Sequence, residues 1–97
     1  MKFDELLDTL LYCGLSIELS FDSKLGCNVY DLNIHLKSRM ILHVKDGVIY
    51  CSQRYDRVNI INSIEDLVDI HKYWFRVSSR DHELTLCKSW ENVYKLA

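Results

Sequence analysis

The residues most suited to chemistry are two histidines that alternate with apolar residues in the middle of the chain. His35 and His43 fall at polar positions of predicted β-strands, so we expect both on the solvent-facing side of a sheet. The predicted register places His43 opposite Asn33 and His35 opposite Ile41, which makes the histidines diagonal neighbours about 7–8 Å apart. Two zinc ligands at that spacing would have to lean together. Because histidines on an exposed strand more often form part of a polar surface, we predict no metal ion and no cofactor.

A second candidate is the segment 50–57, with the sequence Tyr-Cys-Ser-Gln-Arg-Tyr-Asp-Arg. Tyrosine and arginine dominate binding hot spots, because each offers a large contact area together with a directed polar group. The predicted binding surface consists of Tyr50, Arg54, Tyr55, Arg57, His43 and Lys45. The alternative interpretation is that these residues only decorate a β-strand, where aromatic side chains are common.

Local motifs of catalysis and phosphate binding are absent from the sequence. It contains no G-x-x-x-x-G-K-[ST], no G-x-G-x-x-G and no G-x-S-x-G, and its three glycines make a phosphate-binding loop hard to build. No local motif places a nucleophile beside a base or pairs two carboxylates in contrasting surroundings. We therefore expect a protein that is not an enzyme, although a site assembled from distant segments would leave no such motif.

The cysteines and the first residues bear on where the protein works. Cys13, Cys27, Cys51 and Cys87 are far apart and form no C-x-x-C pair, so they predict neither a zinc site nor thiol exchange. Two acids at positions 4 and 5 stand where a signal peptide carries positive charge. No apolar run approaches the roughly 20 residues of a membrane-spanning helix. We expect a cytoplasmic protein with reduced, mostly structural cysteines and no membrane partner.

Charge is distributed unevenly along the chain. Residues 1–23 carry five acids against one lysine, a net charge of −4, whereas residues 37–57 carry five basic residues against two acids, a net charge of +3. The net charge of the whole chain is −2, which disfavours general nucleic-acid binding. A basic sheet face with Tyr50 and Tyr55 would still suit single-stranded nucleic acid through base stacking, and this stays an alternative.

The opening residues predict a helix over 4–13. Its apolar stripe consists of Phe3, Leu6, Leu7, Leu10 and Leu11. Asp4 is the expected N-cap, and Gly14 supplies the left-handed residue that commonly ends a helix.

Alternating residues then predict four antiparallel strands, over 15–21, about 30–36, 40–44 and 48–53. Residues 22–26 form a turn, and Asp46-Gly47 is the strongest hairpin signal in the chain. The expected opposite pairs are Leu42 with Cys51, Val44 with Ile49, Leu36 with Met40 and Ile34 with Leu42, the last two across a three-residue loop at 37–39. All these pairs fall on one apolar face. The other face is expected to meet solvent and carries Asp31, Asn33, His35, Ile41, His43, Tyr50, Ser52 and Arg54.

Two more helices are predicted near the end of the chain. Ser63 is the expected N-cap of the first, with Asp66 three residues on, and this helix ends near Trp74 or Phe75. On its buried side, His71 is expected to be a core histidine with its hydrogen bonds satisfied. Residues 76–88 are left open between loop and strand. Ser89 is the expected cap of a last helix that holds Trp90, Val93, Tyr94 and Ala97, and both tryptophans are expected in the core.

These elements together predict a single α+β domain over residues 1–97. It consists of an N-terminal helix, a four-stranded antiparallel meander and two C-terminal helices packed on one face of the sheet. The length suits one domain, and the hydrophobic fraction of 48% suits a chain that folds without staples.

This architecture resembles the small accessory proteins encoded by bacteriophages, some anti-CRISPR proteins among them. The resemblance lies in the opening Met-Lys-Phe-Asp-Glu-Leu-Leu of residues 1–7, the meander through Asp46-Gly47, and the helix start Ile-Asn-Ser-Ile-Glu-Asp-Leu of residues 61–67. It implies a non-enzymatic protein that binds a host protein or complex, in the host cytoplasm, and inhibits or redirects it. The alternatives are a chaperone or immunity protein that caps a cognate partner, expected as a homodimer, and a small nucleic-acid-binding protein.

Overall fold

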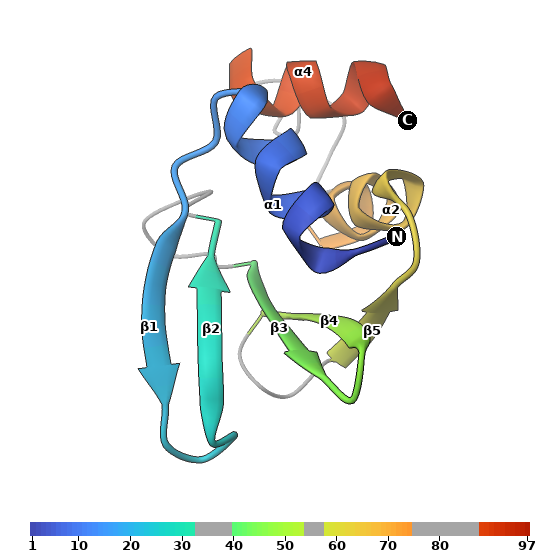
Figure 1. Ribbon diagram of the computed structural model, residues 1–97. Coiled ribbons are helices and arrows are strands. Elements are labelled where there is room, and N and C mark those ends of the chain that lie inside the picture. Colours follow the sequence, from blue (N-terminus) through green and yellow to red (C-terminus); the bar gives the residue numbers. More distant parts are fainter. Residues whose placement is uncertain (33–39, 54–57, 75–87) are drawn as a thin grey trace. The chain divides into compact units, whose positions relative to one another are not determined.

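The structure, a computed structural model, consists of a helical unit and a sheet unit (Figure 1). It describes residues 1–32, 40–53, 58–74 and 88–97. The helical unit combines residues 1–14 with residues 63–97, and the sheet unit spans residues 15–62. The α+β class, the N-terminal helix and the C-terminal helices are confirmed. That the two units form a single domain, with helices packed on one face of the sheet, stays a prediction.

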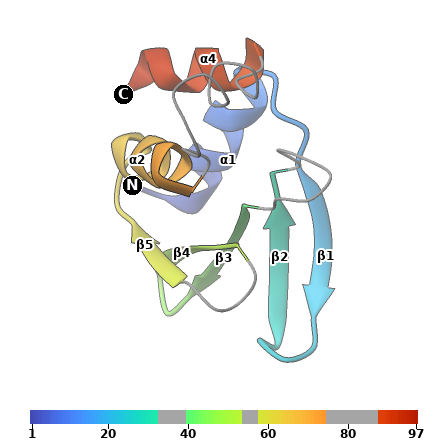
Figure 2. The same cartoon turned by 180° about the vertical axis from the view of Figure 1, so that it is seen from behind.

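The sheet is an antiparallel meander of five strands, one more than we predicted (Figure 2). The strands are β1 (Glu18–Asp22), β2 (Cys27–Asp31), β3 (Ile41–Lys45), β4 (Val48–Ser52) and β5 (Val58–Ile61), paired in chain order. The additional strand, β5, pairs with β4 and places Ile60 opposite Tyr50 and Ile61 opposite Ile49. Its consecutive isoleucines interrupt the apolar–polar alternation, so this strand escapes a search for period two.

Two predicted turns are confirmed, and each has a local cause. Asp46 and Gly47 have φ values of 53° and 75°, and two successive residues of positive φ are what a type I′ hairpin turn requires. In the turn between β1 and β2, the Asp22 carboxylate accepts hydrogen bonds from the backbone N–H groups of Lys24 and Leu25, at 2.8 and 2.9 Å. Side-chain bonding of this kind makes aspartate a common first residue of turns.

The register between β2 and β3 differs from the prediction. Leu42 pairs with Tyr30 rather than Ile34, and Ile41 pairs with Asp31 rather than His35, a shift of four residues in both cases. An even shift leaves every side chain on its predicted face, which is why the pattern alone could not separate the two registers. The predicted pairs of β3 with β4, Leu42 with Cys51 and Val44 with Ile49, are confirmed.

The pairing divides the strand residues between two faces, which we call the Leu42 face and the His43 face. The Leu42 face carries Leu19, Phe21, Asn28, Tyr30, Leu42, Val44, Ile49, Cys51, Asn59 and Ile61. The His43 face carries Glu18, Ser20, Asp22, Cys27, Val29, Asp31, Ile41, His43, Lys45, Val48, Tyr50, Ser52, Val58 and Ile60.

The Leu42 face is buried in the middle of the sheet but not at β1. Leu42 and Cys51 are fully buried, whereas Leu19 is 59% exposed and Phe21 is 66% exposed. The prediction that β1 buries its apolar side chains is therefore wrong. β1 stands at the end of the strand order, where a side chain has a neighbouring strand on one side instead of two.

The helical unit contains three described helices, α1 (Phe3–Tyr12), α2 (Ile64–Trp74) and α4 (Lys88–Leu96). The N-cap of α1 is Lys2, without a side-chain hydrogen bond, so the prediction of Asp4 as N-cap is wrong. Because α1 begins one residue earlier than predicted, Asp4 lies inside its first turn, where a carboxylate is favoured by the helix dipole. The cap of α2 is confirmed, since the Asp66 N–H donates to Ser63 Oγ at 3.3 Å.

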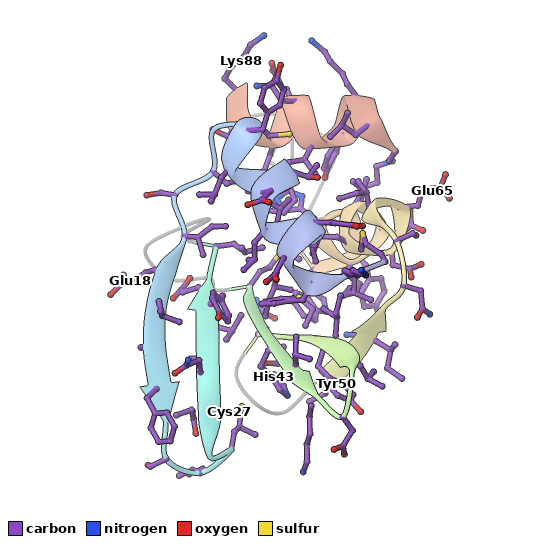
Figure 3. All side chains as sticks on the ribbon, in the orientation of Figure 1. Glu18, Cys27, His43, Tyr50, Glu65 and Lys88 are labelled. Carbon is purple, nitrogen blue, oxygen red and sulfur yellow. The ribbon has the colours of Figure 1, made fainter. Side chains whose placement is uncertain are left out.

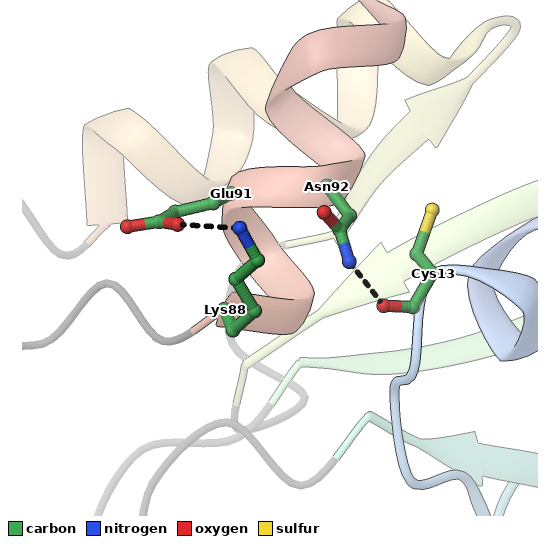
Figure 4. Close-up of polar contacts among 4 residues, drawn as sticks. All are labelled: Cys13, Lys88, Glu91 and Asn92. Carbon is green, nitrogen blue, oxygen red and sulfur yellow. Dashed lines mark hydrogen bonds and ion pairs between the residues drawn. The ribbon is translucent and has the colours of Figure 1, made fainter.

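The end of α1 is bonded to α4, seventy-five or more residues further along the chain. Ser89 Oγ donates to the Gly14 carbonyl at 3.0 Å. Asn92 Nδ2 donates to the Cys13 carbonyl at 2.9 Å (Figure 4). Ser89 is thus inside α4 and not its N-cap as predicted, because the helix already includes Lys88. Gly14 has a φ of 101°, which confirms the predicted left-handed end of α1.

The core of the helical unit includes a histidine, as predicted. His71 is 1% exposed, its Nδ1 is hydrogen-bonded to the Tyr94 hydroxyl at 2.5 Å, and its ring stacks on Trp90 with centroids 4.1 Å apart. Trp90 is 1% exposed and confirms its predicted core position. Trp74 is only half-buried at the end of α2, so its predicted core position is wrong; a residue in the last turn has fewer helix neighbours to cover it. No helix in the described ranges is long and apolar enough to cross a bilayer.

Candidate interaction surface

Three of the six predicted binding residues come together on the His43 face. His43 and Lys45 lie on β3, and Tyr50 lies directly opposite His43 on β4 (Figure 3). The other three, Arg54, Tyr55 and Arg57, lie outside the described residues, as does His35. The candidate surface is therefore built here from β3, β4 and β5.

His43 and Tyr50 form a stacked pair rather than two independent surface residues. Their ring centroids are 5.2 Å apart, and the ring planes are inclined by 19°. His43 is only 6% exposed, whereas Tyr50 is partly exposed. The prediction that His43 meets solvent is thus wrong, because the tyrosine ring stacks against the imidazole and because β3 has a strand on both sides. Ile41 and Ser52, predicted on the same solvent-facing side, are also buried, at 4% and 1%.

Burial also sets the protonation of His43. Desolvation lowers its pKa below the ordinary value of 6.5, because a buried site disfavours the charged imidazolium. The Asp22 carboxylate acts in the opposite direction, and the Lys45 ammonium reinforces the lowering. The imidazole is therefore neutral at pH 7, with one ring nitrogen able to donate and the other able to accept a hydrogen bond.

Two buried polar atoms on the His43 face lack hydrogen-bond partners. They are His43 Nδ1 and Ser52 Oγ, which have none among the described residues. The two side chains belong to adjacent strands and occupy neighbouring positions, since Ser52 pairs with Ile41 and Tyr50 pairs with His43. A buried polar group without a partner is costly, so we expect each of these atoms to bond to a buried water molecule. Ser52 carries no signal in the sequence that distinguishes it from other strand serines.

The edge of this face is apolar and open to solvent. Val58 and Ile60 on β5 are 52% and 53% exposed. In the register, Ile60 stands beside Tyr50 and Val58 stands beside Ser52. Sequence reasoning missed both because it missed β5, although the run Val-Asn-Ile at 58–60 does alternate. We call Tyr50, Val58 and Ile60 the β5 surface. Lys45 and His43 lie on the same sheet face, on β3.

The described residues provide neither a reactive thiol nor a metal site. Cys13, Cys27 and Cys51 are free thiols, and Cys87 lies outside the described part of the chain. Burial raises the pKa of Cys51 to about 12 and also raises the pKa of Cys13, so both thiols stay protonated and poorly nucleophilic. Within the described ranges, no three histidine, cysteine or acidic residues gather to hold a metal ion.

The helical unit has a shallow hollow of about 430 Å³, lined by Tyr12, Cys13, Asn92, Lys95 and Leu96. Its groups offer little chemistry. The Asn92 amide is engaged with the Cys13 carbonyl, the Cys13 thiol is protonated, and Tyr12 is 93% exposed. No described residue of this hollow provides a base next to a nucleophile. We therefore place the candidate site on the sheet.

Comparison of the chain with protein-family models, with curated proteins and with solved structures finds no match. The functional argument therefore rests on the chemistry of the surface itself.

Proposed function

We propose that this chain is a non-enzymatic protein-binding module and that the β5 surface is its main contact. The observation that carries the proposal is the pair Val58 and Ile60, half-exposed on an edge strand next to the stacked rings of Tyr50 and His43. Apolar side chains that share one strand face with an aromatic ring are typical of a contact that excludes water.

The charges of the His43 face favour a protein over a nucleic acid. Glu18, Asp22 and Asp31 lie on this face, against Lys45 as the described basic residue. Carboxylates repel phosphate groups, and nucleic-acid binding depends on basic residues that neutralise phosphates. Arg54 and Arg57, which belong to the predicted binding surface, add positive charge to the sequence between β4 and β5. We expect them to contact acidic groups of the partner.

Tyr50 and Lys45 give the contact its polar component, because Tyr50 is partly exposed and Lys45 is exposed on the same face. His43 and Ser52 on this face are buried, and among the described residues His43 Nδ1 and Ser52 Oγ have no hydrogen-bond partner. The resemblance to bacteriophage accessory proteins suggests a host protein or complex in the host cytoplasm as the partner, which binding would inhibit or redirect. The alternative is that the chain is a chaperone or immunity protein that caps a cognate partner through the same surface.

The direct test is photocrosslinking in cells of the source, or of its host if the source is a phage. A photoreactive amino acid replaces Ile60 in one variant and Tyr73 in the other, and Tyr73 is a matched control because it is a 70% exposed residue on α2. We expect one defined protein adduct from position 60 and none of the same mass from position 73. Identical adducts from both positions, or none from position 60, would contradict the β5 surface.

A second measurement tests the residues once an adduct is identified by mass spectrometry. The purified partner is titrated with the wild type, with Val58→Ser/Ile60→Ser, and with Leu11→Ser/Tyr73→Ser, which removes two exposed hydrophobic side chains from the helical unit. We expect the β5 variant to bind at least tenfold more weakly, equivalent to about 1.4 kcal/mol, and the control to bind like the wild type. Equal affinities for all three chains would contradict the proposal.

A further inference from the structure

We infer that protonation of His43 displaces Tyr50 from its stacked position and thereby weakens partner binding at the β5 surface. The two rings form an acid-sensitive switch, which is able to bind while the imidazole is neutral and is disrupted when the imidazole is charged. This regulation rests on the proposed function, because it acts on the same surface. The movement of the two rings can nevertheless be measured on the free chain, without a partner.

The first support is the direct contact between the histidine and the β5 surface. His43 and Tyr50 are opposite residues of β3 and β4 (Figure 3), and their rings are stacked with centroids 5.2 Å apart. Tyr50 is also the residue opposite Ile60 on β5. His43 is only 6% exposed, whereas Tyr50 is partly exposed, so a buried ring supports a ring that reaches solvent. A movement of the imidazole therefore changes the position of an aromatic side chain of the contact.

The second support is the surroundings of the ring nitrogen Nδ1 of His43. This atom is buried and has no hydrogen-bond partner among the described residues. A neutral imidazole has one nitrogen without a proton, but both nitrogens of an imidazolium are donors. The charged ring must therefore place an N–H donor at Nδ1, where no atom of the described residues accepts it. One buried water molecule can accept this bond, but it does not replace bulk solvent around a charge.

The charges near His43 do not offset the cost of burying an imidazolium. Burial has the largest influence on the pKa of His43 and lowers it below 6.5, whereas the Asp22 carboxylate raises this pKa and the Lys45 ammonium lowers it. Asp22 and Asp31 have further interactions of their own. The other titratable groups that the described strands place on this face are Glu18, Cys27, Asp31 and Tyr50. The stacked position therefore favours the neutral ring.

Acid shifts the equilibrium between a stacked and a displaced His43. Because the stacked position disfavours the charge, a proton binds more tightly to a His43 that has moved into water. The stacked state is fully present above pH 6.5, and the displaced state gains population as the pH falls through the lowered pKa. A charged ring is still attracted to the face of a phenol, but that attraction does not solvate its N–H groups. We therefore expect Tyr50 to lose its support in acid.

The first experiment follows both rings by NMR in the free chain. Isotope-labelled histidine and tyrosine give ring signals between about pH 7.5 and about pH 5, and the variants His43→Phe and Tyr50→Phe assign them. We expect the cross-peaks between the two rings to disappear with the midpoint at which His43 takes up its proton. In His43→Phe, whose ring can stack but not titrate, the cross-peaks to Tyr50 should persist. The opposite pair Leu19 and Tyr30, on the Leu42 face, is the internal reference for an intact sheet.

The second experiment measures binding of the partner identified by the crosslink at position 60. Its affinity is determined at about pH 7.5 and at about one pH unit below the His43 midpoint, where about one tenth of the imidazole is neutral. We expect the wild type to lose about tenfold more affinity than His43→Phe at the lower pH. His82→Gln, which removes a histidine outside the described residues, should behave like the wild type. Circular dichroism shows whether each chain is folded, and His43→Gln replaces His43→Phe if the larger ring prevents folding.

Three results would overturn the switch. Cross-peaks that persist through the His43 midpoint would show that the stack survives protonation, even where no partner has been found. A His43 that takes up no proton above about pH 5 would lie outside the range in which histidine acts as a switch. Equal losses of affinity in the wild type and His43→Phe would show that the proton on His43 does not affect the contact. Failure of the proposed function is distinct, since it appears as the absence of an adduct from position 60 at neutral pH.

Discussion

Gly14 combines an unusual backbone conformation with a close neighbour. Its φ of 101° is one that residues with a side chain rarely adopt, and a Cβ at this position would lie 3.2 Å from Ser89 Oγ. Gly26, with a φ of 68°, has open space at the same position. The two glycines therefore differ in crowding as well as in φ.

We expect Gly14→Ala to lower the free energy of unfolding by more than Gly26→Ala, which should cost about 1 kcal/mol from the backbone alone. Urea denaturation of the two variants measures the difference. In the Ser89→Ala background, the excess cost of Gly14→Ala should shrink, because the crowding atom is gone. Equal losses for both glycines would show that Ser89 moves aside freely.

Buried thiol and phenol groups make the folded state sensitive to high pH. Burial raises the pKa of Cys51 from 9.0 to about 12, and that of Tyr94 from 10.0 to about 12. Between the ordinary pKa of each group and about pH 12, the group is deprotonated in the unfolded chain and still protonated in the folded chain. The stability that these two groups contribute is therefore fully present below pH 9 and falls as the pH rises towards 12. Each group contributes a slope of at most about 1.4 kcal/mol per pH unit.

We expect the free energy of unfolding of the wild type to decline from about pH 9. In Cys51→Ala the decline above pH 9 should be shallower than in the wild type, because the pKa of Cys13 is raised as well and Tyr94 adds its own decline only from about pH 10. The cavity left by Cys51→Ala adds a cost that does not depend on pH. Cys27→Ala, at a half-exposed cysteine, is the control and should follow the wild-type profile. A Cys51→Ala profile parallel to the wild type at every pH would contradict this assignment.

At the scale of elements, two polar contacts of α4 differ in what they should contribute. Asn92 donates to the partly buried Cys13 carbonyl at 2.9 Å, whereas Lys88 and Glu91 form an ion pair at 3.7 Å whose side chains are 76% and 46% exposed (Figure 4). The hydrogen bond satisfies a carbonyl that the end of α1 leaves open. The ion pair is screened by water.

We expect Asn92→Ala to lower the free energy of unfolding by about 1 kcal/mol, and Lys88→Ala by no more than a few tenths of that. Thermal and urea denaturation of both variants show which substitution lowers the free energy of unfolding more. The reverse order, with the larger loss in Lys88→Ala, would mean that α4 is held by its surface charges.

Which elements could be predicted from the sequence depended on how regular their patterns are. The leucines at 6 and 10, buried in α1, and the turn at Asp46-Gly47 follow from spacing and from backbone chemistry, and both are confirmed. β5 could not be found in this way, because Ile60 and Ile61 are adjacent. The β2–β3 register was undetermined, because Tyr30 and Ile34 offer equivalent apolar partners for Leu42 on the same face.

For the whole molecule, the candidate surface was only partly predictable. The pairing of Tyr50 with the His43 strand followed from the hairpin, but the burial of His43 and Ser52 did not, since polar residues at alternate positions normally indicate solvent. The exposure of Leu19 and Phe21 ran against the same rule. In both cases the burial of a face depends on what covers it, and that is a tertiary property which strand periodicity does not contain.

The helical unit should depend on both chain ends at once. α1 has ten residues, too few for a stable isolated helix in water, and α4 supplies the donors for the Cys13 and Gly14 carbonyls. We expect a chain truncated after residue 87 to lose hydrogen-exchange protection throughout α1. The local turn at Lys24 and Leu25, bonded to the Asp22 side chain, is the internal reference and should keep its protection. Protected α1 amides in the truncated chain would contradict this dependence.

The bonds between α1 and α4 also impose an order of events during synthesis. The Gly14 carbonyl meets its donor 75 residues later, which takes roughly 4–15 s at translation rates of about 5–20 residues per second. The five described strands are made within that interval, and each pairs with the strand that follows or precedes it in the chain. The carbonyls at the end of α1 are therefore without their α4 donors until after the described strands have been made.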